Sequence, residues 1–482
     1  MADSSLKDKT AKGLLWGGIG NGGMQVLNLI FGIFLARLLD STDYGMVAVL
    51  TIFSAMAGVF TESGFIMALV NKKDATPEDY NAVFWFNITV GAIIYIILFF
   101  CTPLIARFYN TPDLVRLAHF QFLGFVFSSF GTAPTAYLVR NLMVKQRSVV
   151  TIVAMTLSGI VGLVMAFNGY GYWSLATQTV VYTALTSILL WSVVRLKLSF
   201  RIRFQTIREL FPFGSKLLIT SLFTNINNNV FSSLIGRFYS IREAGYFSQG
   251  NKWVMMGSMS ILGTLNGIGQ PVLRQAVGDN DRQKNIFRKL LRFTAFVCFP
   301  MMFGLGIVSK EVIVITVTEK WLPSVPVMQL LCVWGAFMPI SSLYVSLVNS
   351  LNRPNIYMWN TIALGLLQLA CLVLSYPMGL NFMISAFVTV NILWLFVWQH
   401  FAHKYIGLTM NDVVRDTLPY LAITLGVMAV TIFLTRPIEN MYLSLIAKIL
   451  IAGGLYVGSM WMLGSQIFKE SVDYLLKRKK FE

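Results

Sequence analysis

The sequence predicts an all-α protein that crosses a membrane about fourteen times. Of its 482 residues, 56% are hydrophobic and only 12% are charged, whereas about a quarter of the residues of a soluble protein carry a charge. The apolar residues gather in runs of about 20, which is the length that a helix needs to span a bilayer. The connections between the runs are short, so we expect no domain outside the membrane.

Each run is expected to form an α-helix, because a lipid-exposed segment must satisfy its own backbone hydrogen bonds. The fourteen expected spans are residues 13–36, 45–70, 82–105, 117–137, 149–168, 172–194, 211–236, 245–272, 290–309, 323–348, 355–377, 381–402, 417–435 and 441–463.

An internal repeat relates the two halves of the chain. Residues 13–45 read GLLWGGIGNGGMQVLNLIFGIFLARLLDSTDYG, and their pattern returns about two hundred residues later. The pairs that share one offset are Asn28 and Asn228, Phe31 and Phe231, Arg37 and Arg237, Asp43 and Glu243, and Gly45 and Gly245. The first and seventh spans cross in the same direction, so the halves are expected to be parallel repeats related by an axis along the membrane normal.

The repeat predicts two lobes of six helices each, followed by two further helices. The N-terminal lobe is expected to comprise residues 1–210 with spans 1–6, and the C-terminal lobe residues 211–405 with spans 7–12. Residues 406–482 then hold spans 13 and 14 and a basic tail.

The basic residues predict the orientation of the chain. A net charge of +17 would suggest a nucleic-acid partner in a soluble protein, but here the basic residues lie in loops between apolar spans. The loops on the side of the N-terminus hold 27 Lys and Arg residues, and the loops on the other side hold 8. Because cytoplasmic loops are enriched in Lys and Arg, both termini are expected in the cytoplasm and no nucleic-acid partner is expected.

Ionisable residues inside spans are costly and are therefore candidates for function. Glu62 could carry a proton or bind a cation, or it could be a protonated packing residue. Lys216 either snorkels to the headgroups or pairs with Glu62 to close the cytoplasmic side. Lys252 is too deep to snorkel easily; with Trp253 beside it, it suits a pyrophosphate and a sugar, although a lysine bonded to carbonyls remains the alternative. Lys448, outside the repeat, is expected to snorkel.

Amide side chains form a polar pattern on the first and seventh spans. Such residues either bond helices to one another or line a hydrated cavity, and both roles remain open. The amides of the first span share one helix face, since their spacing is i, i+4, i+7. The residues in question are Asn21, Gln25, Asn28, Asn225, Asn227, Asn228 and Asn229.

The sequence has no motif typical of a soluble enzyme. It lacks a GxxxxGK[ST] phosphate-binding loop and an HExxH metal motif, so neither an ATP motor nor a metalloprotease is predicted. Its four cysteines lie in apolar spans without metal-like spacing, as expected of small buried hydrophobic residues. A secondary transporter, and not an enzyme, is therefore expected.

Five stretches carry the most specific sequence pattern: LARLLDSTDYG, PFGSKLLITSLFTNINNNVFSSLIGRFYSIREAGYFSQGNK, QPVLRQAVGDNDRQKNIFRKLLR, EKWLPSVPVMQLL and LVNSLNRP. They resemble the polysaccharide-transporter family, in particular the Wzx-type, WzxC-like flippases of the multidrug/oligosaccharidyl-lipid/polysaccharide exporter superfamily. The likeness runs from about residue 10 to residue 410. Many relatives carry an acidic residue in span 7, where this sequence has only amides.

The resemblance implies a substrate that the composition does not. Such a flippase moves undecaprenyl-pyrophosphate-linked oligosaccharide across the bacterial inner membrane by alternating access, for surface polysaccharide such as lipopolysaccharide or capsule. The expected partners are this lipid-linked oligosaccharide and membrane lipid, with glycan polymerase and glycosyltransferases as further candidates. No metal or organic cofactor is expected, and a coupling cation, H⁺ or Na⁺, with Glu62 as its carrier, is left open.

Three other functions remain open on the sequence alone. A cation-coupled multidrug antiporter of the same superfamily would need acidic residues in its cavity, where only Glu62 is available. A membrane glycan polymerase or ligase would need a large outer loop. A lipid II flippase for cell-wall synthesis would share the architecture described above.

Overall fold

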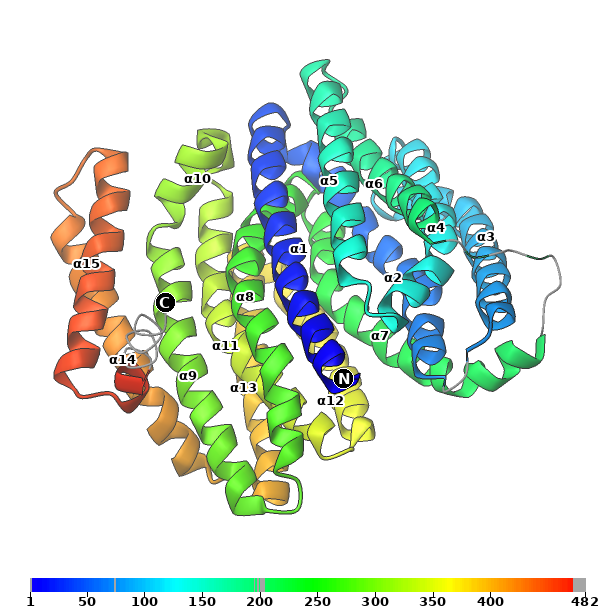
Figure 1. Cartoon of the computed structure of the whole chain (residues 1–482). Helices are drawn as coiled ribbons and strands as arrows, with labels where there is room; N and C mark the ends of the chain where they lie inside the picture. Colours follow the sequence, from blue (N-terminus) through cyan, green and yellow to red (C-terminus); the bar gives the residue numbers. More distant parts are fainter. Residues whose placement is uncertain (1, 73–74, 195, 197–198, 200–203, 471–482) are drawn as a thin grey trace. The chain divides into compact units, whose positions relative to one another are not determined.

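The computed structural model describes the backbone of residues 2–72, 75–194, 196, 199 and 204–470. These residues form helices and connections, and none of them lies in a strand. Fourteen helices of at least 22 residues follow one another in the order of the fourteen predicted spans. The all-α, polytopic fold class is therefore confirmed (Figure 1).

The helices begin and end close to the predicted limits. They are α1 (Ala2–Leu38), α2 (Ser41–Asn71), α3 (Pro77–Phe108), α4 (Leu114–Arg140), α5 (Val144–Phe167), α6 (Tyr172–Val193), α7 (Phe204–Phe238), α8 (Ile241–Gln275), α9 (Asn280–Ile307), α11 (Ser324–Ser350), α12 (Pro354–Ser375), α13 (Leu380–Ile406), α14 (Met410–Thr435) and α15 (Met441–Met462). The short helices are α10 (Ser309–Val317), η1 (Glu319–Trp321) and η2 (Tyr376–Met378).

Twelve of the helices are long and apolar enough to cross a membrane, among the residues that the structure describes. The other two long helices, α7 and α8, fall outside that set. Side chains in both are only partly described, and both carry polar residues within their length. The count of fourteen crossings is therefore approximate, whereas the multi-pass character is established.

Local sequence signals fix where the last two long helices begin. At the start of α14, the Thr409 hydroxyl accepts a hydrogen bond from the Asp412 amide at 3.2 Å, and the Asp412 carboxylate accepts one from the Thr409 amide at 3.1 Å. This reciprocal capping box satisfies amides that have no partner within the helix. At the start of α15, the side-chain oxygen of Asn440 caps the helix by accepting hydrogen bonds from the amides of Tyr442 and Leu443.

Packing divides the chain into two compact units, residues 1–248 and 249–482. We describe each unit by itself. The division falls within α8, whereas the boundaries predicted at residues 210 and 405 follow the repeat. Those two boundaries remain predictions.

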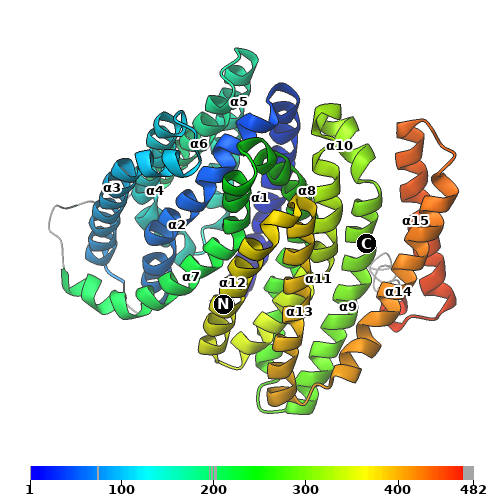
Figure 2. The same cartoon turned by 180° about the vertical axis from the view of Figure 1, so that it is seen from behind.

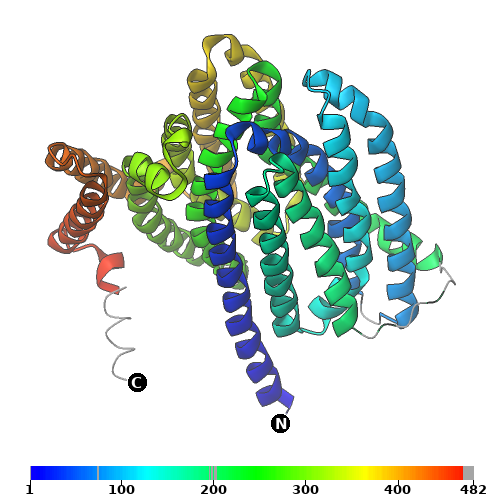
Figure 3. The ribbon, with the colours of Figure 1, turned by 90° about the horizontal axis from the view of Figure 1, so that it is seen from above.

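In the first unit, glycines on α1 allow close packing against α5 (Figure 3). A Cβ added to Gly20 would lie 2.3 Å from the Ser148 hydroxyl oxygen, and one on Gly159 would lie 2.5 Å from the Phe31 ring. The Ser148 hydroxyl donates to the carbonyl of Trp16 at 3.0 Å. Small residues let membrane helices approach closely, and here they do so on one face of α1.

The first unit also contains a contact between two segments that the repeat relates. A Cβ on Gly45 of α2 would lie 1.8 Å from the carbonyl oxygen of Ile241, and a Cβ on Gly245 of α8 would lie 1.8 Å from the carbonyl oxygen of Ser41. Ser41 and Ile241 are separated by the repeat offset, as are Gly45 and Gly245. The contact is therefore reciprocal, and no residue larger than glycine fits at either position without a backbone shift.

The connection between α3 and α4 reinforces this contact at the end of α7. The hydroxyl of Tyr109 hydrogen-bonds to the hydroxyl of Ser233, and burial raises the pKa of Tyr109. The guanidinium of Arg237 lies over the ring of Phe108, 5.2 Å from its centroid. In the orientation that satisfies both atoms of its amide, Asn110 accepts a hydrogen bond from Arg237 at 3.2 Å.

In the second unit, α9 is the centre of the packing and contacts α11, α13, α14 and α15. Figure 2 shows α14 and α15 beside α9 from behind, and Figure 1 shows the same arrangement from the front. The hydroxyl of Tyr456 on α15 donates to the carbonyl of Phe296 on α9 at 2.8 Å. The two helices outside the repeat are thus packed onto a helix that belongs to it.

We expect Gly45→Ala and Gly245→Ala each to destabilise the protein, because the new methyl group would overlap a backbone carbonyl. Overpacking of this kind costs about 1–3 kcal/mol of unfolding free energy. The measurement is the melting temperature of the purified protein in detergent. Gly58→Ala on α2 and Gly263→Ala on α8 are matched controls, because a Cβ at either position meets nothing within 4 Å. Equal melting temperatures for all four variants would contradict the close contact.

Candidate substrate site

Lys252 lies on α8, on the side opposite the face that packs against the rest of the second unit. That packing face carries Gly250, Val254 and Ser258. A Cβ on Gly250 would meet the Ser324 carbonyl of α11 at 3.1 Å, and the Ser258 hydroxyl lies 3.4 Å from the Gly335 carbonyl oxygen, its acceptor. At 100° per residue, Lys252 projects from the other side of the helix. Its side chain is half-buried.

Among the described residues, no acidic side chain pairs with Lys252, and no hydrogen bond holds its ammonium. The alternative in which Lys252 bonds to backbone carbonyls is therefore not observed in this part of the chain. A buried charge without a partner is strongly unfavourable, whereas a bound anion would compensate it. This position can thus take an anionic group.

Two neutral polar atoms near Lys252 are also without partners. The indole nitrogen of Trp253 and the side-chain oxygen of Gln249 are buried, and neither has a hydrogen-bond partner in the described structure. Gln249 is 1% exposed. Trp253 was predicted from the sequence as a site residue, whereas Gln249 was not. The sequence feature that could have indicated Gln249 is its position one helical turn before Trp253 and close to Lys252.

The amides of α1 lie on a different face from the glycines that contact α5. Asn21 and Gln25 are exposed, and Asn28 is half-buried. None of the three forms a hydrogen bond with a described residue. The face of α1 that carries the glycines packs against α5, so these amides do not hold the two helices together.

The amides of α7 behave differently from one another. Asn225 donates to the Ser221 carbonyl and Asn229 donates to the Asn225 carbonyl, each at 2.9 Å within the same helix. Asn228 is exposed and bonds to no described residue. An exposed amide in a membrane helix is costly against lipid, so Asn228 is suited to a hydrated surface.

For two further predicted residues, the structure describes the backbone but not the side chain. Glu62 lies on α2 and Lys216 on α7, but their side chains are outside the described part of the structure. The predicted pair between them remains a prediction. Gln25, Asn28, Asn225 and Asn228 belong to the first unit, whereas Lys252 and Trp253 belong to the second.

The prediction that Lys448 snorkels is wrong. Its ammonium pairs with the carboxylate of Glu311 on α10 and donates to the Ile307 carbonyl at 3.1 Å. The Ser444 hydroxyl donates to the same Glu311 oxygen at 2.9 Å. Glu311 was assigned to a loop in the sequence analysis, and α10 instead brings this acid against α15.

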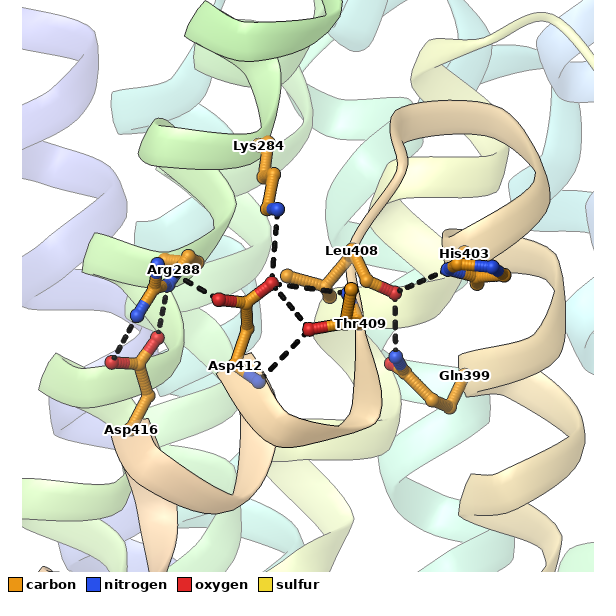
Figure 4. A network of polar contacts seen from close by, with 8 residues as sticks. All are labelled: Lys284, Arg288, Gln399, His403, Leu408, Thr409, Asp412 and Asp416. Atoms are coloured by element: carbon orange, nitrogen blue, oxygen red, sulfur yellow. Dashed lines mark hydrogen bonds and ion pairs between the residues drawn. The ribbon is translucent and has the colours of Figure 1, made fainter.

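A second set of ion pairs joins α14 to α9 (Figure 4). Arg288 donates two hydrogen bonds to the Asp416 carboxylate, at 2.6 and 3.1 Å. Lys284 lies 2.9 Å from a carboxylate oxygen of Asp412, and Arg288 contacts the other oxygen at 3.1 Å. These cations have acidic partners, so they stabilise the attachment of α14 and leave little charge for a ligand.

His403 and Gln399 complete the network at the start of α14. The Nδ1 of His403 lies 3.2 Å from the carbonyl oxygen of Leu408, and the side-chain amide of Gln399 donates to the same oxygen at 2.8 Å (Figure 4). This contact fixes the turn between α13 and α14. Over the described residues, no group of three or more His, Cys, Asp or Glu side chains is arranged to hold a metal ion.

Together, the long apolar helices and the reciprocal contact between repeat-related segments define a multi-pass helical membrane protein with an internal repeat. Residues 34–326 match the family model described as polysaccharide biosynthesis protein. The chain belongs to this family, and the resemblance found in its motifs is confirmed.

Three relatives have names that refer to the biosynthesis of a polysaccharide. The chain is 24% identical over 363 residues to the lipopolysaccharide biosynthesis protein WzxC of Escherichia coli K12, covering 73% of this chain and 72% of that protein. It is 23% identical over 333 residues to the teichuronic acid biosynthesis protein TuaB of Bacillus subtilis 168, covering 69% of each. It is 23% identical over 347 residues to the succinoglycan biosynthesis transport protein ExoT of Rhizobium meliloti 1021, covering 71% of this chain and 70% of that protein.

Solved structures share the fold. The lipid II flippase MurJ in an inward closed conformation superposes with a TM-score of 0.75 at 15% identity, covering 95% of this chain and 99% of that chain. A multidrug resistance MATE family transporter in an inward-facing conformation gives a TM-score of 0.66 at 16% identity, covering 80% of this chain and 94% of that chain. At this identity the likeness establishes the fold alone.

We expect Lys448→Met to destabilise the protein strongly, because it leaves the Glu311 carboxylate buried without its counter-charge. Breaking one side of a buried pair costs about 3–5 kcal/mol. The double variant Lys448→Met/Glu311→Gln should lose less than the single variant, since no charge is then stranded. Melting temperatures in detergent measure both effects.

The matched control is Lys289→Met, which removes an exposed pair. Lys289 lies 2.6 Å from Glu470, and the two side chains are 59% and 56% exposed. Such a surface pair contributes about 0–1 kcal/mol. If Lys448→Met and Lys289→Met lower the melting temperature equally, Lys448 does not anchor α15.

Proposed function

We propose that this protein is a flippase that moves undecaprenyl-pyrophosphate-linked oligosaccharide across the bacterial inner membrane, for the synthesis of a surface polysaccharide. Membership of the polysaccharide biosynthesis family supports the pathway. One relative is named as a transport protein of succinoglycan biosynthesis, and one neighbour in fold is named as a lipid II flippase.

The observation that carries this proposal is that Lys252 has no ion-pair or hydrogen-bond partner among the described residues. A pyrophosphate linkage bears negative charge that the ammonium would neutralise, and the apolar tail of the lipid could remain in the bilayer while the head crosses. The favourable pairing compensates the cost of holding a lysine within a membrane helix. The exposed amides Gln25 and Asn228 and the half-buried Asn28 would then provide hydrogen-bonding groups for hydrated sugar.

Transport by alternating access fits the internal repeat. The reciprocal contact of Gly45 with the α8 start, and of Gly245 with the α2 start, would close the side away from the termini. The head group would then enter from the cytoplasm, where the distribution of Lys and Arg places both termini. Lys216 would meet it first and Lys252 second, and Glu62 is the proposed carrier of a coupling H⁺ or Na⁺.

A cation-coupled multidrug antiporter is the main alternative, since MATE transporters share the fold. The charge at the site disfavours it: Lys252 would repel a cationic drug, and no described acidic residue neutralises it. Drug susceptibility of a deletion strain separates the two functions, because the flippase proposal expects unchanged susceptibility to cationic drugs.

We expect Lys252→Gln to reduce surface glycan to less than a tenth of the wild-type level in a deletion strain, whereas Lys252→Arg should retain most of it. The expectation follows because loss of a charge-assisted contact of about 1.5–3 kcal/mol lowers binding roughly 10- to 100-fold. The measurement is surface polysaccharide per cell, together with the lipid-linked oligosaccharide that accumulates inside.

Lys289→Gln is the matched control, because Lys289 is an exposed lysine of the same unit. Protein amounts in the membrane must be equal among the variants. Wild-type glycan levels from Lys252→Gln would disprove the assignment of the pyrophosphate site.

A further inference from the structure

One acceptor and one donor lie unsatisfied on the same flank of α8. The side-chain oxygen of Gln249 and the indole N–H of Trp253 are both buried, and neither has a hydrogen-bond partner among the described residues. Residues i and i+4 of a helix are neighbours on its surface, with about 5–6 Å between their Cβ atoms. Lys252 lies between them in sequence, and its ammonium has no partner among the described residues.

The indole nitrogen of Trp394 on α13 is likewise buried without a hydrogen-bond partner among the described residues, whereas two more exposed indoles have partners. The N–H of Trp191 donates to the Phe130 carbonyl at 2.8 Å, and the N–H of Trp85 donates to the Ser199 carbonyl at 2.8 Å. Leaving a buried donor or acceptor unpaired is unfavourable by about 1–3 kcal/mol. Two such atoms at adjacent positions, beside an uncompensated charge, indicate that a ligand completes them.

A hydroxyl group is the ligand whose chemistry matches both atoms. Its proton can be donated to the Gln249 oxygen while its oxygen accepts from the Trp253 N–H. A phosphate oxygen could accept from the indole but could not donate to the glutamine oxygen. A carbonyl has the same limitation.

We infer that Gln249 and Trp253 recognise one hydroxyl of the sugar that is attached directly to the pyrophosphate. This inference rests on the proposed function, because Lys252 on the same helix then holds the pyrophosphate next to that sugar. Gln249 and Trp253 set which first sugar is accepted, and Lys252 binds the charge that all such lipids share. A site built to hydrogen-bond a hydroxyl discriminates strongly against an analogue that lacks it, since its buried groups then stay unpaired.

The test uses the full-length protein in proteoliposomes. The substrates are undecaprenyl pyrophosphate bearing the first sugar of the host's own repeat unit, and the set of its monodeoxy analogues. Transport of each is followed as the fraction of sugar that becomes accessible on the far side of the vesicle. The wild-type protein should move one of the deoxy analogues roughly 5- to 100-fold more slowly than the parent sugar.

The variants Gln249→Leu and Trp253→Phe should each reduce that ratio to less than about twofold. Trp191→Phe is the matched control, since it removes an indole N–H that already has a protein partner, and it should keep the wild-type ratio. Gln249→Leu replaces an unpaired buried amide by an apolar side chain, so it should melt no lower than the wild type.

The results separate this inference from the proposed function. If the wild-type protein moves the parent and every deoxy analogue at equal rates, or if Gln249→Leu discriminates as well as the wild type, the inference is wrong while the flippase function stands. A structural water bridging Gln249 and Trp253 would give that second result. If the wild-type protein moves no lipid-linked sugar at all, both are wrong.

Discussion

The close approach of Gly45 to Ile241, and of Gly245 to Ser41, is the constraint on which the rest of the first unit depends. At both places a backbone carbonyl occupies the volume that any side chain would need, so two segments two hundred residues apart are held at the distance of backbone contact. The α3–α4 connection then packs on the same region through Tyr109 and Arg237. Sequence repetition and spatial reciprocity coincide at this contact within the first unit.

The helices outside the repeat are held by a different physical interaction. Arg288 pairs with Asp416 near the start of α14, Lys448 pairs with Glu311 on α15, and Tyr456 bonds to the Phe296 carbonyl between them. Buried ion pairs contribute little net stability compared with apolar packing, but removing one partner is costly. Their value is therefore in fixing one position of α14 and α15 along α9.

Hydrophobic runs of bilayer length predicted the order of the helices well, because in lipid a helix is nearly the only solution for a single segment. The repeat identified Gly45 and Gly245 as an equivalent pair, but their contacts with Ile241 and Ser41 were not predicted. Side-chain partners could not be obtained in this way. Lys448 looked like a snorkelling residue because Glu311 lies 137 positions away in what read as a loop. Gln249 was not predicted, because the sequence does not show whether neighbouring groups form hydrogen bonds with a glutamine side chain. The split of the amides into exposed residues and residues bonded within α7 has the same cause.

Two lysines, Lys448 on α15 and Lys252 on α8, differ in whether described residues compensate their charge. Lys448 has a carboxylate, a carbonyl and a nearby hydroxyl, so its charge is neutralised by the protein itself. Lys252 has none of these among the described residues, and its equivalent in the first half of the repeat is Ile52, a buried apolar side chain. The repeat can therefore account for the presence of α8 but not for the charge on it. We propose that this charge, which no described residue compensates and which has no counterpart in the first half of the repeat, is compensated by an anion from outside the protein.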